Sequence, residues 1–153
     1  MSQQKRDFPP LLGAGLHAMS IEDLGELTTS AFPQSKNRPL LFGFLEIYLS
    51  HLSRLGLVAD VWIDGSFMCQ KDEPEDVDIV VLWDAASVRD LGDDEWTKVD
   101  LMLRNEYAVQ MFRIDVHPID RSNEDDVAFW MQKFGTQRDN KTPKGLALLR
   151  LNQ

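Results

Sequence analysis

Two apolar runs joined by a polar loop constrain the fold of this 153-residue chain more than any other stretch. The first covers about residues 59–64 and the second about residues 76–83, and both are rich in valine, isoleucine and tryptophan. Such residues favour β-strands, whose successive side chains alternate between two faces. Gly65 and Ser66 follow the first run, and glycine permits a sharp change of direction there. The sequence therefore predicts a strand, a tight turn, a loop and a second strand.

The second run begins with two acidic residues on one face. In a strand, positions two apart share a face, so Asp76 and Asp78 are expected to point the same way. Adjacent carboxylates repel each other and are costly to desolvate. A divalent cation removes this repulsion, and Mg²⁺ prefers oxygen ligands while keeping positions for water and phosphates. The acidic pair beside a Gly-Ser turn therefore predicts a site for a metal-bound nucleoside triphosphate.

The order of these residues resembles a known signature. Gly65-Ser66, nine further residues and then Asp76-Val77-Asp78-Ile79 is similar to the signature of the DNA polymerase beta superfamily of nucleotidyltransferases. The resemblance implies an α/β (α+β) fold, with a small mixed β-sheet backed by helices and a third acidic residue on a later strand. Alternating apolar and polar residues at 111–118 predict such a strand, which carries Asp115.

The resemblance also implies a set of ligands and a reaction. Three aspartates would hold two Mg²⁺ or Mn²⁺ ions: Asp76, Asp78 and Asp115. The outer phosphates of the nucleoside triphosphate would rest on Gly65 and Ser66. An acceptor hydroxyl would attack the α-phosphorus in line and release pyrophosphate, with Asp115 also a candidate base. Asp64 is expected to orient the turn rather than to bind metal.

Two lysines are further candidates for nucleotide contacts. Lys71 lies in the loop between the two strands, where the alternative interpretation is a solvated charged loop. Lys144 belongs to a basic tail, residues 133–150, with five basic residues and one acidic residue. Such a tail is suited to a triphosphate, an RNA end or an acidic partner, and the alternative is a solvated turn.

The acceptor is inferred from the size of the chain. With no obvious second domain to grip RNA, the chain is similar to the minimal nucleotidyltransferases, small bacterial proteins that often act with a partner. The resemblance implies a toxin–antitoxin or phage-defence setting, with AMP placed on a protein partner encoded nearby and RNA as the alternative acceptor. Four segments are also similar to a small uncharacterised bacterial family: Phe8-Pro9-Pro10-Leu11-Leu12, Gly15-Leu16-His17, Trp62-Ile63-Asp64-Gly65-Ser66-Phe67 and Lys144-Gly145.

Two other functions are consistent with the same residues. The first is a catalytically silent module that keeps the nucleotidyltransferase fold and docks a basic partner on its acidic face. The second is a metal-dependent phosphohydrolase, but the chain lacks a His-Asp pair at metal-ligand spacing. The presence of all three aspartates favours the enzyme over the silent module.

Composition indicates an ordinary globular protein. Hydrophobic residues make up 43% of the chain and charged residues 27%, and the net charge of -9 argues against general affinity for nucleic acid. The single cysteine, Cys69, excludes an intrachain disulfide and fits a reducing cytoplasm. The longest apolar stretch, residues 40–58, contains charged residues and predicts an amphipathic helix rather than a membrane span.

The whole chain, 1–153, is expected to form one domain in three parts. Residues 1–57 form a strap and helices, 58–118 the catalytic core, and 119–153 a C-terminal helix and the basic tail. Within these parts the sequence predicts an extended strap at 1–19, a surface connection at 84–94 and a last strand at the sheet edge at 146–151. It also predicts four helices, at 20–31, 35–55, 95–107 and 123–134. Trp96 is expected on a buried helix face, and Pro118 is expected to end the Asp115 strand.

Overall fold

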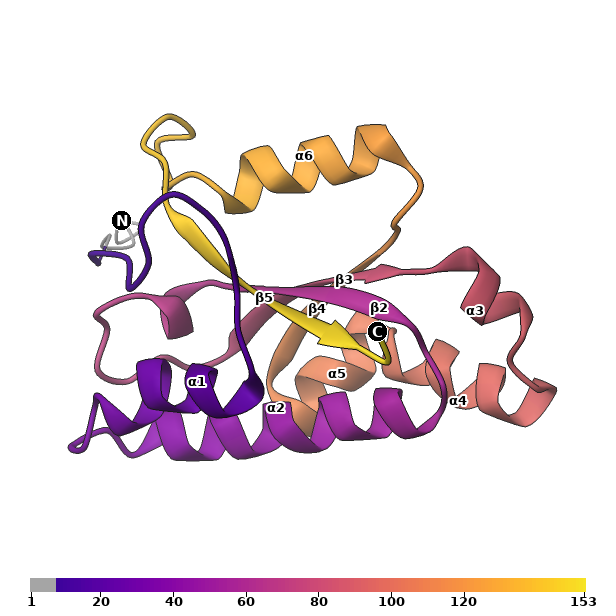
Figure 1. Ribbon diagram of the computed structural model, residues 1–153. Coiled ribbons are helices and arrows are strands. Elements are labelled where there is room, and N and C mark those ends of the chain that lie inside the picture. Colours follow the sequence, from indigo (N-terminus) through magenta and orange to yellow (C-terminus); the bar gives the residue numbers. More distant parts are fainter. Residues whose placement is uncertain (1–7) are drawn as a thin grey trace.

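A five-stranded mixed sheet forms the centre of the computed structural model, which describes residues 8–153 (Figure 1). The strands are β1 (Gly15–Ala18), β2 (Ala59–Asp64), β3 (Val77–Trp83), β4 (Ile114–Asp120) and β5 (Gly145–Leu151). Their order in the sheet is β1-β5-β2-β3-β4. β1 runs parallel to β5 and β3 parallel to β4, whereas β2 is antiparallel to both of its neighbours. The prediction of a small mixed sheet backed by helices is confirmed.

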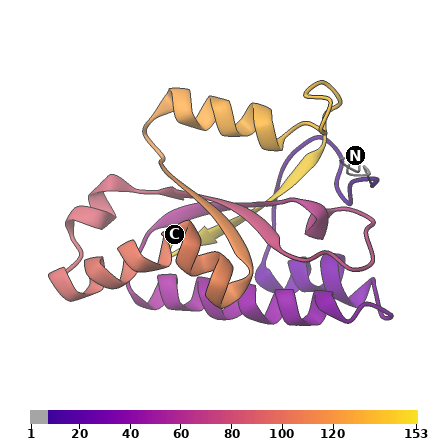
Figure 2. The ribbon, with the colours of Figure 1, turned by 180° about the vertical axis from the view of Figure 1, so that it is seen from behind.

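Six α-helices and two short turns of other helix types complete the described chain. They are α1 (Ile21–Gly25), the π-helical η1 (Glu26–Ser30), α2 (Asn37–Arg54), the 3-10 turn η2 (Ser66–Met68), α3 (Ala85–Arg89), α4 (Asp93–Met102), α5 (Asn105–Phe112) and α6 (Glu124–Phe134). Figures 1 and 2 show α1, α2, α4 and α5 on one side of the sheet and α6 alone on the other. Among residues 8–153, no helix combines the length and the apolar character that a membrane crossing requires.

The alternation of side chains along the strands produces two separate apolar clusters. Val61, Ile63 and Ile79 point toward α2 and belong to the larger cluster, where all three are fully buried. Trp62 and Val80 point the other way and pack in a smaller cluster beneath α6, together with Phe134. Burying a side chain of this size stabilises the fold by roughly 1.5–3 kcal/mol. The sheet therefore has two buried faces, which fits its position between helices.

Several helix boundaries follow the sequence signals. The Ser20 hydroxyl accepts a hydrogen bond from the Asp23 N–H, and the Asn123 side chain accepts one from the Asp126 N–H, so both residues are N-caps, as serine and asparagine commonly are. Gly56, with φ +93°, follows α2 and adopts the left-handed conformation that ends many helices. Of the predicted strap, residues 1–7 lie outside the described part of the chain.

The region between β3 and β4 differs from the prediction. The expected surface connection at 84–94 contains α3, and the single helix expected at 95–107 is two helices, α4 and α5. The break lies at Arg104, whose backbone is extended. Next to it, the Asn105 side chain accepts a hydrogen bond from the Val116 N–H, a long-range contact without a local sequence signal. Trp96, expected to be buried, is 43% exposed, whereas Val99 and Met102 of the same helix are buried.

Three predictions about strands were also wrong. Residues 15–18 form β1 rather than an irregular strap, because β5 supplies a parallel partner from the far end of the chain. β5 therefore lies inside the sheet, between β1 and β2, and not at its edge. β4 continues past Pro118 to Asp120. It is one of the two edge strands, and an edge position tolerates a residue that lacks an N–H.

Candidate functional site

Three aspartates lie side by side on the sheet face that carries α6. Asp64 is the last residue of β2 and pairs in register with Asp78 of β3. Asp78 in turn pairs in register with Asp115 of β4. Neighbouring strands are about 4.8 Å apart, so the three carboxylates form a row across three strands, here called the acid row. The structure thus brings together two of the predicted metal ligands and adds Asp64, which the sequence did not assign to the metal.

Asp76, the remaining predicted ligand, lies just outside the strand. β3 begins at Val77, one residue later than predicted, and Asp76 is exposed. Its negative charge still acts on Asp78 and helps to raise the pKa of that carboxyl. Asp76 is therefore an acidic residue at the rim of the acid row.

The electrostatics of the acid row centre on Asp78. Burial, a hydrogen bond with Asp115 and the charges of the surrounding acids raise the pKa of Asp78 to about 8. A carboxyl with this pKa is largely protonated at neutral pH, and its proton can be shared with Asp115. Such crowding is costly for the fold, and a divalent cation would relieve it.

Gly65 allows the acid row to pack against the turn that follows β2. Its backbone has φ +82° and ψ -168°, a region that is essentially restricted to glycine. A Cβ atom at this position would collide with the Asp78 carboxylate. Ser66 then begins η2, so the predicted phosphate-binding pair lies directly beside the acid row. The turn needs a glycine for its conformation and for the space that Asp78 occupies.

Lys144 contacts the acid row at the end formed by Asp64. Its Nζ lies 2.9 Å from Asp64 Oδ1, so the two side chains form an ion pair, with Asp64 buried and Lys144 mostly so. Burial raises the pKa of Asp64, and the charge of Lys144 opposes that rise. The predicted nucleotide residue Lys144 therefore belongs to the site, but in this structure its partner is Asp64.

An aromatic cluster borders the other end, beyond Asp115. The His117 Nε2 atom lies 3.7 Å from Asp115 Oδ2, and the His117 ring stacks on Trp130 of α6 at 4.3 Å between centroids. Burial lowers the pKa of His117, Asp115 opposes this and the charge of Lys133 adds to it. The ammonium of Lys133 lies 5.1 Å from the Trp130 centroid. In the sequence, Trp130 falls in the predicted helix 123–134 and Lys133 at the start of the basic tail.

The side chains of Asp78, Asp115 and His117 have the donor atoms and the spacing of a metal site. They offer two carboxylate oxygens and one ring nitrogen that all lie within 4.8 Å of one another. A neutral imidazole with two carboxylates suits Mn²⁺, and hard oxygen ligands suit Mg²⁺. The donor set, together with the crowded carboxyls, fits one divalent cation. The predicted second ion has its nearest further carboxylates in Asp76 and Asp64, and Asp64 already pairs with Lys144.

A buried arginine shapes the loop that follows Gly65-Ser66. Arg38, at the start of α2, is fully buried and stacks on Phe32 at 3.8 Å. Its guanidinium donates to five backbone carbonyls: those of Thr28, Ser66, Phe67, Cys69 and Lys71. Desolvation lowers the pKa of Arg38 to about 10, so the group stays charged. The sequence indicated Arg38 only as part of a helix start, and no local signal distinguishes it.

Lys71 does not join the acid row in this arrangement. Its carbonyl accepts from Arg38, and its ammonium lies 5.9 Å from the centroid of the Phe8 ring. The loop conformation set by Arg38 therefore directs the Lys71 side chain toward the N-terminal segment.

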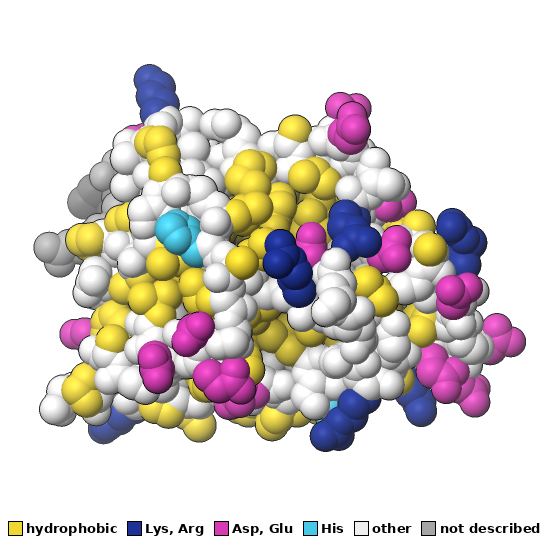
Figure 3. All heavy atoms as spheres, viewed as in Figure 1, with side chains coloured by type: hydrophobic (Ala, Val, Ile, Leu, Met, Phe, Trp, Pro, Cys, Tyr) yellow, Lys and Arg dark blue, Asp and Glu magenta, His cyan; other side chains and the backbone are white. Residues whose placement is uncertain are grey.

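Away from the acid row, the sheet face covered by α6 is apolar, and a second group of charged residues lies at the opposite end of this face. Figure 3 shows apolar side chains gathered in a hollow, bordered by basic and acidic side chains. At the far end of β2, Arg121 lies 4.0 Å from Asp60 and 3.7 Å from Asp84. The positive charge of Arg121 therefore lies close to the carboxylates of Asp60 and Asp84, whereas the neighbours of Asp78 are other carboxyl groups.

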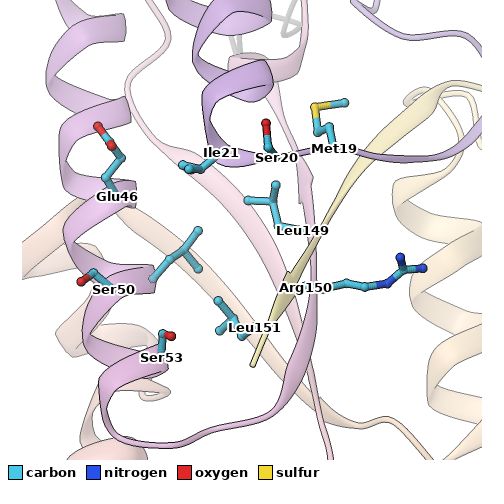
Figure 4. Close-up of a pocket in the computed structure, with 10 residues that line it drawn as sticks. Met19, Ser20, Ile21, Glu46, Ser50, Ser53, Leu149, Arg150 and Leu151 are labelled. Atoms are coloured by element: carbon cyan, nitrogen blue, oxygen red, sulfur yellow. The ribbon is translucent and has the colours of Figure 1, made fainter. Parts of the chain in front are cut away.

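A pocket lies on the other side of the sheet, between α2 and the end of β5 (Figure 4). Its volume is about 370 Å³, and Leu149, Leu151 and Glu46 are among the residues that line it. None of the predicted site residues lines this pocket, so it is separate from the acid row.

The chain belongs to a protein family of unknown function, DUF6932, whose model matches residues 6–150. No curated protein and no solved structure gives a significant match to the chain. The family description names no activity, so a functional proposal has to rest on the geometry of the site.

Proposed function

We propose that this protein is a metal-dependent nucleotidyltransferase of the DNA polymerase beta type. The observation that supports this most strongly is the acid row, in which carboxylates from three adjacent strands meet beside the Gly65-Ser66 turn. A purely structural sheet gains nothing from a carboxyl whose pKa is raised to about 8 by burial and by its neighbours. Crowded acids beside a turn suit a reaction that brings metal and phosphate together.

Each residue has a role in this proposal. Asp78 and Asp115 hold Mg²⁺ or Mn²⁺, with His117 beside them and Asp76 at the rim. A bound divalent cation supplies neutralisation of the triphosphate charge and makes an acceptor hydroxyl more acidic. The turn at Gly65-Ser66 supports the outer phosphates of the nucleotide.

The reaction transfers a nucleoside monophosphate. An acceptor hydroxyl oxygen forms a bond to the α-phosphorus, the bond from that phosphorus to the bridging oxygen breaks, and pyrophosphate leaves. Asp115, one-third exposed at the outer strand, accepts the hydroxyl proton. Orientation of the two reactants and neutralisation of charge provide most of the rate enhancement in such reactions.

The proposed acceptor is a hydroxyl on a macromolecule, with a partner protein encoded nearby as the first candidate and RNA as the alternative. The chain carries a net charge of -9, which disfavours nucleic acid unless the basic tail engages it. Asp115 lies on the edge strand β4, so a loop of a partner can approach it from outside the sheet. Minimal nucleotidyltransferases of toxin–antitoxin and phage-defence systems, which the sequence resembles, act in this way.

The test is transfer of label from α-labelled ribonucleotides in the presence of Mg²⁺ or Mn²⁺. We expect Asp78→Asn and Asp115→Asn each to lower transfer at least ~100-fold while the protein stays folded. The matched control is Asp60→Asn, on the same face of β2 as Asp64 and roughly 13 Å from it along the strand. The assay contains either the neighbouring gene product or total RNA, so the labelled species identifies the acceptor.

Two outcomes would contradict the proposal. If the wild-type protein binds none of the four ribonucleotides by calorimetry with metal present, a silent partner-docking module becomes the better account. If Asp78→Asn and Asp60→Asn transfer label equally well, the acid row is not the catalytic site.

A further inference from the structure

Lys144 is placed at the acid row by backbone contacts on both sides. Its own N–H donates to the Gly135 carbonyl at 2.9 Å, which closes the hairpin between α6 and β5. The N–H of the next residue, Gly145, donates to the Leu12 carbonyl at 3.2 Å. A Cβ atom on Gly145 would collide with the Gly13 carbonyl, so the N-terminal segment lies tightly against this point. The lysine therefore extends from an anchored position.

Asp64 is the acid that receives this lysine. Its side chain is 6% exposed, that of Lys144 is 14% exposed, and the ion pair is 2.9 Å long. Within residues 8–153, the group of acids and histidines close enough to hold a metal contains Asp78, Asp115 and His117 but not Asp64. The acid row is thus divided: Asp64 pairs with Lys144, whereas Asp78 and Asp115 lie close to His117.

We propose that Asp64 holds Lys144 as a fixed cation of the acid row, which weakens binding of a free divalent cation and strengthens binding of a metal–polyphosphate complex. This inference rests on the proposed nucleotidyltransferase function and concerns how its site selects a ligand. The ammonium of Lys144 lies against Asp64, whose strand β2 neighbours the strand of Asp78, so it repels a divalent cation at Asp78 and attracts phosphate oxygens. Lys144 is the residue that meets the phosphates, and Asp64 is a positioning residue.

The consequence is a site that favours the metal–nucleotide complex over the bare metal. A bare divalent cation at Asp78 and Asp115 lies beside a third carboxylate, Asp64, whose negative charge is already balanced by Lys144. A metal–triphosphate complex carries net negative charge, so the same ammonium attracts it. One lysine therefore shifts the two affinities in opposite directions, which a purely structural ion pair would not do.

The test measures Mn²⁺ binding by electron paramagnetic resonance, and binding of Mn²⁺ with α,β-methylene-ATP by calorimetry. We expect Lys144→Met to tighten Mn²⁺ binding about tenfold and to weaken binding of the nucleotide complex about tenfold. Lys144→Arg keeps the charge and should stay within about threefold of the wild type in both measurements. The matched control is Lys98→Met on α4, across the sheet from the acid row, which should change neither affinity.

A double variant keeps the test informative if Lys144→Met alone does not fold. Lys144→Met leaves Asp64 buried without its cation, whereas Asp64→Asn with Lys144→Met removes one charge of each sign. The double variant should bind Mn²⁺ nearly as the wild type does and still lose affinity for the nucleotide complex. Thermal melts show which of the variants are folded.

The outcomes separate this inference from the proposed function. If Mn²⁺ binds the wild type and is lost in Asp78→Asn, but neither affinity changes in Lys144→Met or the double variant, the inference is wrong and the metal site stands. If Lys144→Met weakens both affinities together, the lysine is only structural and the inference is also wrong. If Mn²⁺ binds neither the wild type nor Lys144→Met, the metal site and the inference both fail.

Discussion

Arg38 and Asp78 are ionisable residues that are shielded from water, fully for Arg38 and partly for Asp78, yet their surroundings are opposite. Arg38 is fully buried and donates hydrogen bonds to five backbone carbonyls. Asp78 lies among other carboxyls, and burial together with these neighbours raises its pKa to about 8. The two residues are joined by the Gly65 turn, since Arg38 binds the carbonyl of Ser66 and Gly65 packs against Asp78.

This difference indicates what each residue is for. A buried charge whose hydrogen-bonding capacity is satisfied stabilises the fold and fixes one conformation of the chain around it. A buried charge surrounded by charges of the same sign destabilises the fold, and such costs are tolerated mainly at functional sites. Replacing Arg38 should therefore lower stability, whereas neutralising Asp78 should raise it.

The largest expected effect is that of Arg38→Met. Methionine has a similar length but no donor, so five carbonyls lose their hydrogen bonds to the guanidinium at once. We expect the free energy of unfolding to fall by about 3–5 kcal/mol, which lowers the melting temperature by roughly 8–16 °C. Thermal and urea unfolding measure this loss.

Arg54→Met is the matched control, because Arg54 is an exposed residue of the same helix. Its effect should stay within about 0.5 kcal/mol. Equal losses in the two variants would mean that the carbonyl cluster around Arg38 contributes little to stability, and the comparison with Asp78 would lose its basis.

The next effect tests the turn that joins the two regions. Gly65→Ala places a Cβ atom against the Asp78 carboxylate and forces alanine into a glycine-only backbone region. We expect a loss of about 2–3 kcal/mol in unfolding free energy. Gly43→Ala in α2 is the control, since a Cβ there meets nothing within 4 Å and should stabilise the helix by about 1 kcal/mol. Chemical unfolding should thus give shifts of opposite sign, and a neutral Gly65→Ala would contradict the close packing of the turn.

The sequence predicted those parts of the fold that depend on local patterns. β2, β3, α2 and α6 follow from apolar periodicity, and the caps at Ser20 and Asn123 follow from residue type. The parts that it missed depend on long-range partners. β1 has only four residues, mostly exposed, and forms because β5 pairs with it. The break between α4 and α5 has no glycine or proline to mark it, and Asn105 there bonds to β4.

In the candidate site, too, the sequence predicted what depends on local patterns and missed what depends on long-range contacts. The resemblance to the DNA polymerase beta superfamily brought Asp78, Asp115 and the Gly65-Ser66 turn to one place in the prediction, and strand periodicity gave the face on which each aspartate lies. The pairing of Lys144 with Asp64 could not be predicted, since it depends on how the hairpin before β5 returns to β2. The role of Arg38 was also hidden, because its carbonyl partners come from a loop about 30 residues further along the chain.

A further effect is the pH dependence of stability that Asp78 imposes. The pKa of Asp78 is about 8 in the folded protein and about 3.8 for an ordinary aspartate, so between these values the folded state binds more protons than the unfolded state. Stability should therefore be highest near pH 4 and fall as the pH rises toward 8. Asp78→Asn stays neutral at every pH, and its amide can still donate to Asp115. We expect this variant to match the wild type near pH 4 and to become increasingly more stable than the wild type as the pH rises toward 9, with a higher melting temperature at pH 9.

Thermal melts between pH 4 and pH 9, with a chelator present to remove divalent cations, measure this difference. Asp60→Asn is again the control, because Asp60 lies near Arg121 at the other end of β2, and its curve should run parallel to that of the wild type. If the Asp78→Asn curve also runs parallel to the wild type, Asp78 is not crowded by its neighbours. The acid row would then resemble the Arg38 cluster, a satisfied structural feature, and the argument that its strain marks a functional site would fail.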